Sequence, residues 1–280
     1  MITILSVCKE LPPYSASSLS TSFKFSILAL EISSSFAASR SDPSALRKRS
    51  ACALLHDTIC NVSGLAYQFL SHDLVCASER AYSDFVRLED MWRNEISKGY
   101  RPGGRPNVNS LIMYSLVREL KPVTVIETGV ASGVSSYFLL KALAENNRGI
   151  LISIDLPNLS DPKCYVNKDG RRDFVYTPPD RGVGWLVPQR LKSRWKLVFG
   201  NSLDLLPQIE VKPDLFYHDS DHSYAVMMKE YDWAYNNGSK FTLSDDISWS
   251  RAWMEFVTKN ALSHVEVSDM GVAAMRKQTG

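Results

Sequence analysis

After Pro122 the chain alternates short apolar runs with amphipathic helical segments, and this alternation constrains its fold more than any other feature. The apolar runs predict five strands, at Val123–Glu127, Ile150–Asp155, Lys196–Gly200, Asp214–Asp219 and Phe241–Asp245. Helices are expected at Gly133–Asn146, Tyr224–Asn236 and Ser250–Asn260, and an antiparallel pair at His264–Ser268 and Gly271–Met275. The order predicts an α/β fold, a doubly wound, mostly parallel seven-stranded sheet with helices on both faces. The loops after the parallel strands then share one edge of the sheet, where ligands bind.

The part before Pro122 is less regular. Residues 1–50 are rich in serine and lack apolar periodicity, so we expect a peripheral segment that folds poorly on its own, and its role stays open. Residues 51–120 are expected to form a helical cap, with amphipathic helices at Ala81–Ile96 and Asn107–Leu120. Residues 121–280 then form the ligand-binding domain.

Composition excludes several classes of protein. The net charge is only +2, from 32 basic and 30 acidic residues, which gives no electrostatic footprint for a nucleic-acid partner. The five cysteines are scattered without a C-x-x-C spacing, which argues against a disulfide framework or a zinc site and favours a reducing cytoplasm. No apolar run has the length of a bilayer, so no membrane span is expected.

A glycine-bearing turn follows the first predicted strand, in the stretch Glu127-Thr-Gly-Val-Ala-Ser-Gly133. Gly129 would let the backbone approach a ligand, and Gly133 would permit a tight strand–helix contact. The spacing differs from the G-x-G-x-x-G of dinucleotide enzymes, which argues against a nicotinamide cofactor. Asp155 ends the second strand, where a carboxylate either binds two ribose hydroxyls or caps the next turn.

Five motifs occur in a fixed order: V-I-E-T-G-V-A-S-G-V-S-S, I-S-I-D-L-P, G-N-S-L-D-L-L-P, H-D-S-D-H-S-Y and L-S-D-D. In this order they resemble the Rossmann-like class I S-adenosylmethionine-dependent methyltransferases, and most closely the small, metal-dependent O-methyltransferases acting on sugars and natural products. The resemblance covers about Met91 to Lys277. It implies an S-adenosylmethionine site with Glu127, Gly129 and Gly133 near the methionine part, Asp155 on the ribose, and Asn201 with Ser202 beside the adenine. Ser135 and Asp219 are further cofactor-binding candidates.

Acidic residues follow two neighbouring strands: Asp219 and Asp221 after the fourth, Asp245 and Asp246 after the fifth. Adjacent strands lie about 5 Å apart, so these carboxylates should converge and repel each other unless a cation intervenes. Mg²⁺ is the expected cation, because it prefers oxygen ligands. The resemblance implies Asp219, Asp245 and Asp246 as its ligands, with Asp221 as a further contact or an outer partner.

His222 lies beside this cluster and, with Asp219, is the predicted catalytic pair. A neutral imidazole can take the proton that a hydroxyl loses during methyl transfer. The alternative is that His222 only caps the helix starting near Ser223. His218 precedes Asp219 on the strand and is expected in the core. Trp249 is expected to line the acceptor pocket.

The sequence therefore predicts a metal-assisted O-methyltransferase whose partner is a small-molecule or glycan acceptor. Two alternatives remain open: an N-methyltransferase or metal-independent relative, and a noncatalytic cofactor-binding protein of the same fold. A homo-oligomer also stays open.

Overall fold

The computed structural model describes residues 72–98, 103–156, 165–166, 172–173, 181–267 and 269–275. The serine-rich segment predicted at 1–50 and the first part of the predicted cap lie outside the described residues.

A seven-stranded sheet forms the centre of the molecule, in the order β5-β2-β1-β6-β7-β9-β8. Its strands are β1 (Thr124–Thr128), β2 (Ile150–Asp155), β5 (Trp195–Phe199), β6 (Leu215–His218), β7 (Phe241–Ser244), β8 (Ser263–Val267) and β9 (Met270–Ala274). The first five are parallel, whereas β9 pairs antiparallel with both β7 and β8. The predicted fold class is confirmed, and the predicted strand bounds agree to within one or two residues.

The chain reverses its direction of winding between β1 and β6, which are neighbours in the sheet although β2 and β5 separate them in sequence. From β1 the chain moves outward to β2 and β5, and it then returns to β6 and β7 on the other side. This is the topological switch point at which open α/β sheets bind ligands, outside the carboxyl ends of the strands.

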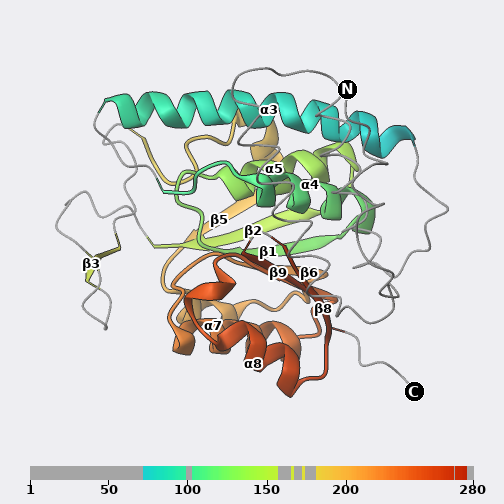
Figure 1. Cartoon of the computed structure of the whole chain (residues 1–280), viewed down its shortest axis with the longest axis vertical. Coiled ribbons are helices and arrows are strands. Elements are labelled where there is room, and N and C mark those ends of the chain that lie inside the picture. The colour runs from blue at the N-terminus through green and yellow to red at the C-terminus, as the bar shows by residue number, and fades with distance from the viewer. Residues whose placement is uncertain are drawn as a thin grey trace, which may run out of the picture.

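Helices α4 (Val108–Leu120) and α5 (Val134–Glu145) cover one face of the sheet, and α3 (His72–Ser97) lies outside them (Figure 1). Leu116 of α4, Leu139 of α5 and Val125 of β1 belong to one fully buried core. Phe85 and Leu88 of α3 belong to the same core, so α3 packs on this layer from outside. Helix α4 begins with a capping box between Asn107 and Ser110 and ends at Lys121 in the left-handed conformation, just before Pro122.

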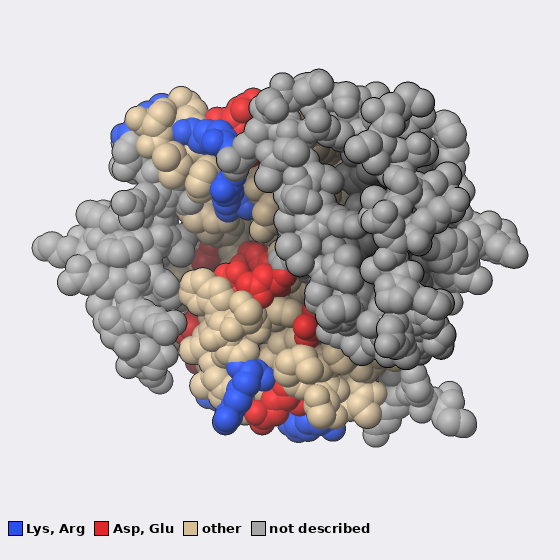
Figure 2. Space-filling view, viewed as in Figure 1, with Lys and Arg blue, Asp and Glu red and all other residues tan. Residues whose placement is uncertain are grey.

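The opposite face is covered by α7 (Tyr224–Asn236) and α8 (Ala252–Lys259) (Figure 1). Phe216 of β6, Tyr231 of α7 and Trp253 of α8 lie in this second core. Among the described helices, none is both long and apolar enough to cross a bilayer. In Figure 2, acidic side chains gather near the middle of the described surface, and acidic and basic side chains lie together above and below them.

Several short elements were not predicted. A two-stranded hairpin of β3 (Tyr165–Val166) and β4 (Arg172–Asp173) lies in the long connection after β2. The others are α6 (Ser202–Leu205) and three 3-10 turns, η2 (Gln189–Arg194), η3 (Leu206–Gln208) and η4 (Ile247–Trp249). Helix α3 begins nine residues before its predicted start at Ala81.

Candidate active site

Backbone hydrogen bonds hold the strand ends of the switch point together. The amide N of Asp219 donates to the carbonyl O of Thr128 at 2.8 Å, and the amide N of Asp245 donates to the carbonyl O of His218 at 2.9 Å. These bonds continue the parallel ladders one residue beyond β6 and β7. The acidic residues predicted to meet are therefore fixed side by side at the carboxyl edge of the sheet.

Gly129 lies where β1 and β6 end, and the neighbouring protein backbone leaves no room for a side chain there. Its φ is +84°, and a Cβ atom added there would lie 1.8 Å from the carbonyl O of Asp219. Gly129 is thus required by the neighbouring protein backbone, and a ligand contact there stays a prediction. Gly133, the N-cap of α5, has φ +85°, and its added Cβ would lie 2.7 Å from Cα of Gly184. The sequence suggested a tight contact between Gly133 and a strand. In the structure the tight contact is with the later segment around Gly184.

Glu127 is fully buried under a cage of serine hydroxyls. Ser135 donates to Oε1 at 2.6 Å, while Ser136 and Ser153 donate to Oε2 at 2.7 and 2.6 Å. Burial raises the pKa of Glu127 to about 7, although the three hydroxyls oppose this shift. Any ligand in the site would meet Ser135, which is 7% exposed, before it met Glu127. Glu127 therefore orients the surrounding hydroxyls.

Asp155 ties its own turn to the glycine turn. Its Oδ2 accepts from the amides of Val130 and Ala131 at 3.1 and 2.8 Å, and its Oδ1 accepts from the amide of Leu156 at 2.7 Å. A carboxylate has about four lone-pair positions, so one remains for a ligand hydroxyl. These bonds tie Asp155 mainly to the glycine turn, and its ribose role stays a prediction.

The residues predicted beside the adenine also have structural partners. The Asn201 side chain accepts from the amide of Leu203 at 2.9 Å and so caps α6. The Ser202 hydroxyl donates to Oε1 of Glu230, a buried residue of α7. Both residues lie directly after β5, at the same edge as Asp155.

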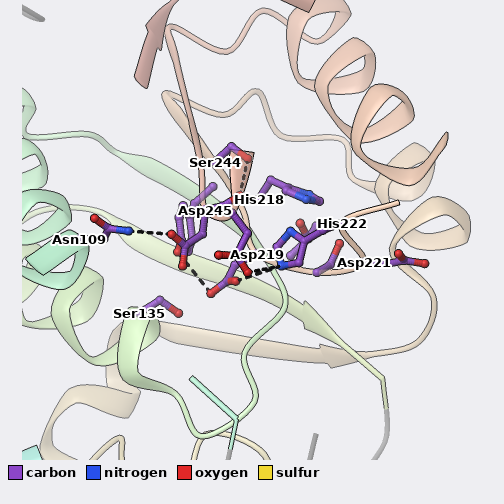
Figure 3. Close-up of polar contacts among 12 residues, drawn as sticks. Asn109, Ser135, His218, Asp219, Asp221, His222, Ser244 and Asp245 are labelled. Carbon is purple, nitrogen blue, oxygen red and sulfur yellow. Dashed lines mark hydrogen bonds and ion pairs between the residues drawn. The ribbon is translucent and has the colours of Figure 1, made fainter. Parts of the chain in front are cut away.

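His222 is the residue around which the acidic side chains gather (Figure 3). Its Nε2 lies 3.4 Å from Oδ2 of Asp246 and 3.8 Å from Oδ1 of Asp219. His222 does not cap α7, because the helix has Ser223 as its N-cap and no side-chain cap bond, and Oδ1 of Asp221 accepts from the amide of Ser223 at 2.8 Å just before the helix. The structure therefore brings together His222, Asp219 and Asp246 and gives Asp221 a role in starting α7.

Burial and neighbouring charges shift the pKa values of this group. Burial, with the nearby His218 ring, lowers the pKa of His222 to about 3, so its imidazole is neutral at physiological pH. Burial and the Asp245 and Asp246 carboxylates raise the pKa of Asp219 well above its usual value. Burial and Asp245 raise the pKa of Asp246 to about 6. Negative charge is thus costly here, as expected of carboxylates that share a small volume.

Asp245 belongs to the same acidic cluster and is held by a residue of α4. Its Oδ1 accepts from Nδ2 of Asn109, on α4, at 2.8 Å (Figure 3). Asp219, Asp245 and Asp246 offer the oxygen donors that Mg²⁺ prefers. In the described part of the chain, however, no three His, Cys, Asp or Glu side chains are grouped as metal ligands. The donors fit in kind, but their arrangement is not that of a three-carboxylate site.

Comparison with known protein families gives one match. Residues 126–237 match the family model of a methyltransferase domain, and this stretch contains the glycine turn, Asp155 and the His222 loop. This part of the chain is therefore similar to a methyltransferase domain. No curated protein matches the chain.

Several solved structures resemble this chain at low sequence identity. SAH-bound PaMTH1 of Podospora anserina is 13% identical, with a TM-score of 0.48 over 76% of this chain and 100% of its own. The O-methyltransferase of Bacillus cereus, in complex with SAH, is 13% identical, with a TM-score of 0.47 over 78% and 97%. TomG of Streptomyces achromogenes, an O-methyltransferase involved in tomaymycin synthesis, is 14% identical, with a TM-score of 0.46 over 68% and 88%.

Three polar residues in or next to the candidate site were not predicted from the sequence. Asn109 comes from the cap helices, Glu230 lies within an otherwise ordinary amphipathic helix, and Tyr217 donates to Oδ2 of Asp219 at 3.3 Å. Only Tyr217 had a local signal, because alternation along β6 places it on the same face as Asp219. His218 is fully buried, as predicted. Trp249 is 55% exposed with its ring 5.3 Å from that of His222, at the edge of the site.

Proposed function

We propose that the methyltransferase moves the methyl group of S-adenosylmethionine to a hydroxyl group of a small molecule, with a sugar or a natural product as the acceptor class. The observation that carries this proposal is the position of His222. A neutral imidazole stands at the carboxyl edge of the sheet, beside the glycine turn, with carboxyl groups on both sides of Nε2. Such a group suits an acceptor that must lose a proton, as a hydroxyl does.

The two ring nitrogens of His222 differ in access. Nδ1 is enclosed and has no hydrogen-bond partner among the described residues, so Nε2 is the nitrogen that can exchange a proton at the site. When bound, S-adenosylmethionine supplies an electrophilic methyl group. Methyl transfer would release the proton of the acceptor hydroxyl, and Nε2 of His222 would take that proton. Asp219 and Asp246 would stabilise the resulting imidazolium.

The cofactor would lie along the edges of β1, β2 and β5. Asp155 retains a free acceptor position for a ribose hydroxyl. Leu156 and Phe199, next to Asp155, are 42% and 53% exposed and provide an apolar surface for the adenine ring. Ser135 and Gly129 border the methionine end. Trp249 offers an aromatic face to the ring of an acceptor.

Mg²⁺ is a separate part of the proposal. A cation among Asp219, Asp245 and Asp246 would relieve the repulsion that raises their pKa values. It would also lower the pKa of a bound hydroxyl. Asn109 bonds only to Oδ1 of Asp245, and the proton route above does not depend on the cation. The scattered cysteines keep the cytoplasm as the proposed location.

The test uses the full chain and labelled S-adenosylmethionine. Calorimetry first measures S-adenosylhomocysteine and NAD, and only the former is expected to bind. A panel of sugars, phenols and other hydroxyl compounds, with amines as a matched panel, is then assayed for methyl transfer. We expect transfer to hydroxyl compounds. Transfer to amines alone would replace the proposal by N-methylation, and cofactor binding without transfer to either panel would favour a noncatalytic role.

The metal is tested in the same assay. Activity lost in EDTA and restored by Mg²⁺, together with Mg²⁺ binding by calorimetry that Asp246→Asn weakens, would support a metal site. Full activity in EDTA would remove the metal and leave the His222 route in place.

A further inference from the structure

Glu230 on α7 is a fully buried carboxylate with four hydrogen-bond donors around it. Oε2 accepts from Thr128 at 2.5 Å and contacts Nδ1 of His218 at 2.6 Å. Oε1 accepts from Ser202 at 2.5 Å and from Ser220 at 2.9 Å. Burial would raise the pKa of Glu230, but His218 and the hydroxyls outweigh it and lower that pKa, so the group is ionised.

The four donors come from three different strand ends. Thr128 ends β1, Ser202 follows β5, and His218 with Ser220 brackets the end of β6. Along the strands, Thr128 and His218 are cross-strand partners whose side chains reach the α7 face, whereas Glu127 and Tyr217 face the other side. One carboxylate on one helix therefore connects three neighbouring loops from below the sheet.

Each connected residue adjoins a residue at the ligand edge. Thr128 precedes Gly129, Ser202 follows Asn201, and Ser220 follows Asp219. These three loops are those that the proposed cofactor would touch at its methionine end, its adenine end and the reacting methyl group. Their relative spacing depends on where Glu230 holds their hydroxyls.

We propose that Glu230 is a positioning residue of the methyltransferase, which sets the spacing of the three loops that receive the cofactor. This inference rests on the proposed cofactor site. Glu230 itself is fully buried, so its effect on binding passes through Thr128, Ser202 and Ser220. Preorganised loops bind more tightly, because the ligand does not have to order them.

A stabilising buried ion pair would have a different signature. Such a pair contributes to the free energy of unfolding and leaves the ligand affinity of the folded protein unchanged. Glu230→Gln alone does not separate the two roles, because a buried histidine that loses its carboxylate can unfold the protein. Deletions of single hydroxyls that bond to Glu230, here called hub variants, separate the two roles. Each one frees one loop from Glu230 and leaves the His218–Glu230 contact in place.

The experiment measures S-adenosylhomocysteine affinity by calorimetry and the melting temperature for Thr128→Val and Ser202→Ala in the full chain. The control is Ser239→Ala, which deletes another buried hydroxyl, bonded to the carbonyl O of Phe241 at the start of β7 and far from the ligand edge. We expect each hub variant to bind about tenfold more weakly, the scale of one hydrogen bond to a charged group. The control should bind like the wild type, and Ser202→Thr, which keeps a hydroxyl, should restore affinity.

Unchanged affinity in both hub variants, with melting temperatures lowered as in Ser239→Ala, would overturn the inference and return Glu230 to a structural role. A wild type that fails to bind S-adenosylhomocysteine would instead overturn the cofactor site itself, and this inference with it.

Discussion

Nδ2 of Asn109 donates a hydrogen bond to Oδ1 of Asp245 at 2.8 Å, although 136 positions separate the two residues in the chain. Asn109 is 3% exposed and lies in the first turn of α4, which the capping box of Asn107 fixes. Helix α4 thus reaches the carboxyl edge of the sheet, where the candidate site lies. Asn109 sets the direction of a carboxylate that the sequence had assigned to a metal.

Asn109→Ala should lower methyl transfer without weakening S-adenosylhomocysteine binding, because Asp245 lies on the acceptor side. Loss of a hydrogen bond to a charged group costs about 1–3 kcal/mol, so kcat/KM should fall about tenfold to a hundredfold. The control is Asn94→Ala, an exposed asparagine of α3. Steady-state kinetics and calorimetry check both effects, and kcat/KM equal to that of the control would remove Asn109 from the site.

Gly129→Ala should separate the ends of β1 and β6. Its Cβ would fall 1.8 Å from the carbonyl O of Asp219. Gly238→Ala is the matched control, since φ is +75° there and no described atom lies within 4 Å of the added Cβ. Both variants carry a left-handed penalty of about 1–2 kcal/mol. We expect Gly129→Ala to lose more stability in thermal melts, and to lose cofactor binding. Equal melting temperatures would show that the backbone at Gly129 adapts.

The sequence predicted the sheet well because the information is local. Each buried parallel strand is an apolar run between turn residues, and the bounds of β2 were predicted to the residue. The bounds of helix α7 were also predicted to the residue, and those of β8 and β9 to within one residue. The convergence of Asp219, Asp245 and Asp246 followed from strand order alone. The same reasoning placed His222 beside them.

What the sequence did not show depends on side-chain direction across the fold. Alternation along a strand shows that Thr128 and Glu127 face opposite sides of the sheet. It does not show that Thr128 donates a hydrogen bond to Glu230 of α7. Asn109 is one of several polar residues of α4, and only the packing of α4 on α5 brings it to Asp245. The sequence also could not show that the backbone of Asp219 lies against Gly129, because the two residues are 90 positions apart in the chain.

Glu127 should make the stability of the protein depend on pH. Its pKa is about 7 in the folded protein and near 4.5 in an unfolded chain, so the folded state binds the proton more tightly. This contribution is complete below pH 4.5 and is lost as the pH rises through about 7, with a cost of about 3 kcal/mol. Glu127→Gln should lack this loss. Denaturant unfolding from about pH 5 to pH 8 checks it, and parallel curves for the two proteins would contradict it.

His222→Ala should lower kcat for the acceptor identified in the panel by about 10²–10⁴-fold, the usual contribution of a general base. S-adenosylhomocysteine affinity should stay near that of the wild type, because His222 faces Asp219, Asp246 and the Trp249 ring at the acceptor side. His264→Ala is the control, since that histidine lies on the exposed part of β8 and contacts the Trp253 ring. Melting temperatures of both variants show whether the loss of kcat reflects unfolding. A folded His222→Ala protein with wild-type kcat would mean that another group, or water, takes the acceptor's proton, and that His222 only packs beside Asp219 and Asp246.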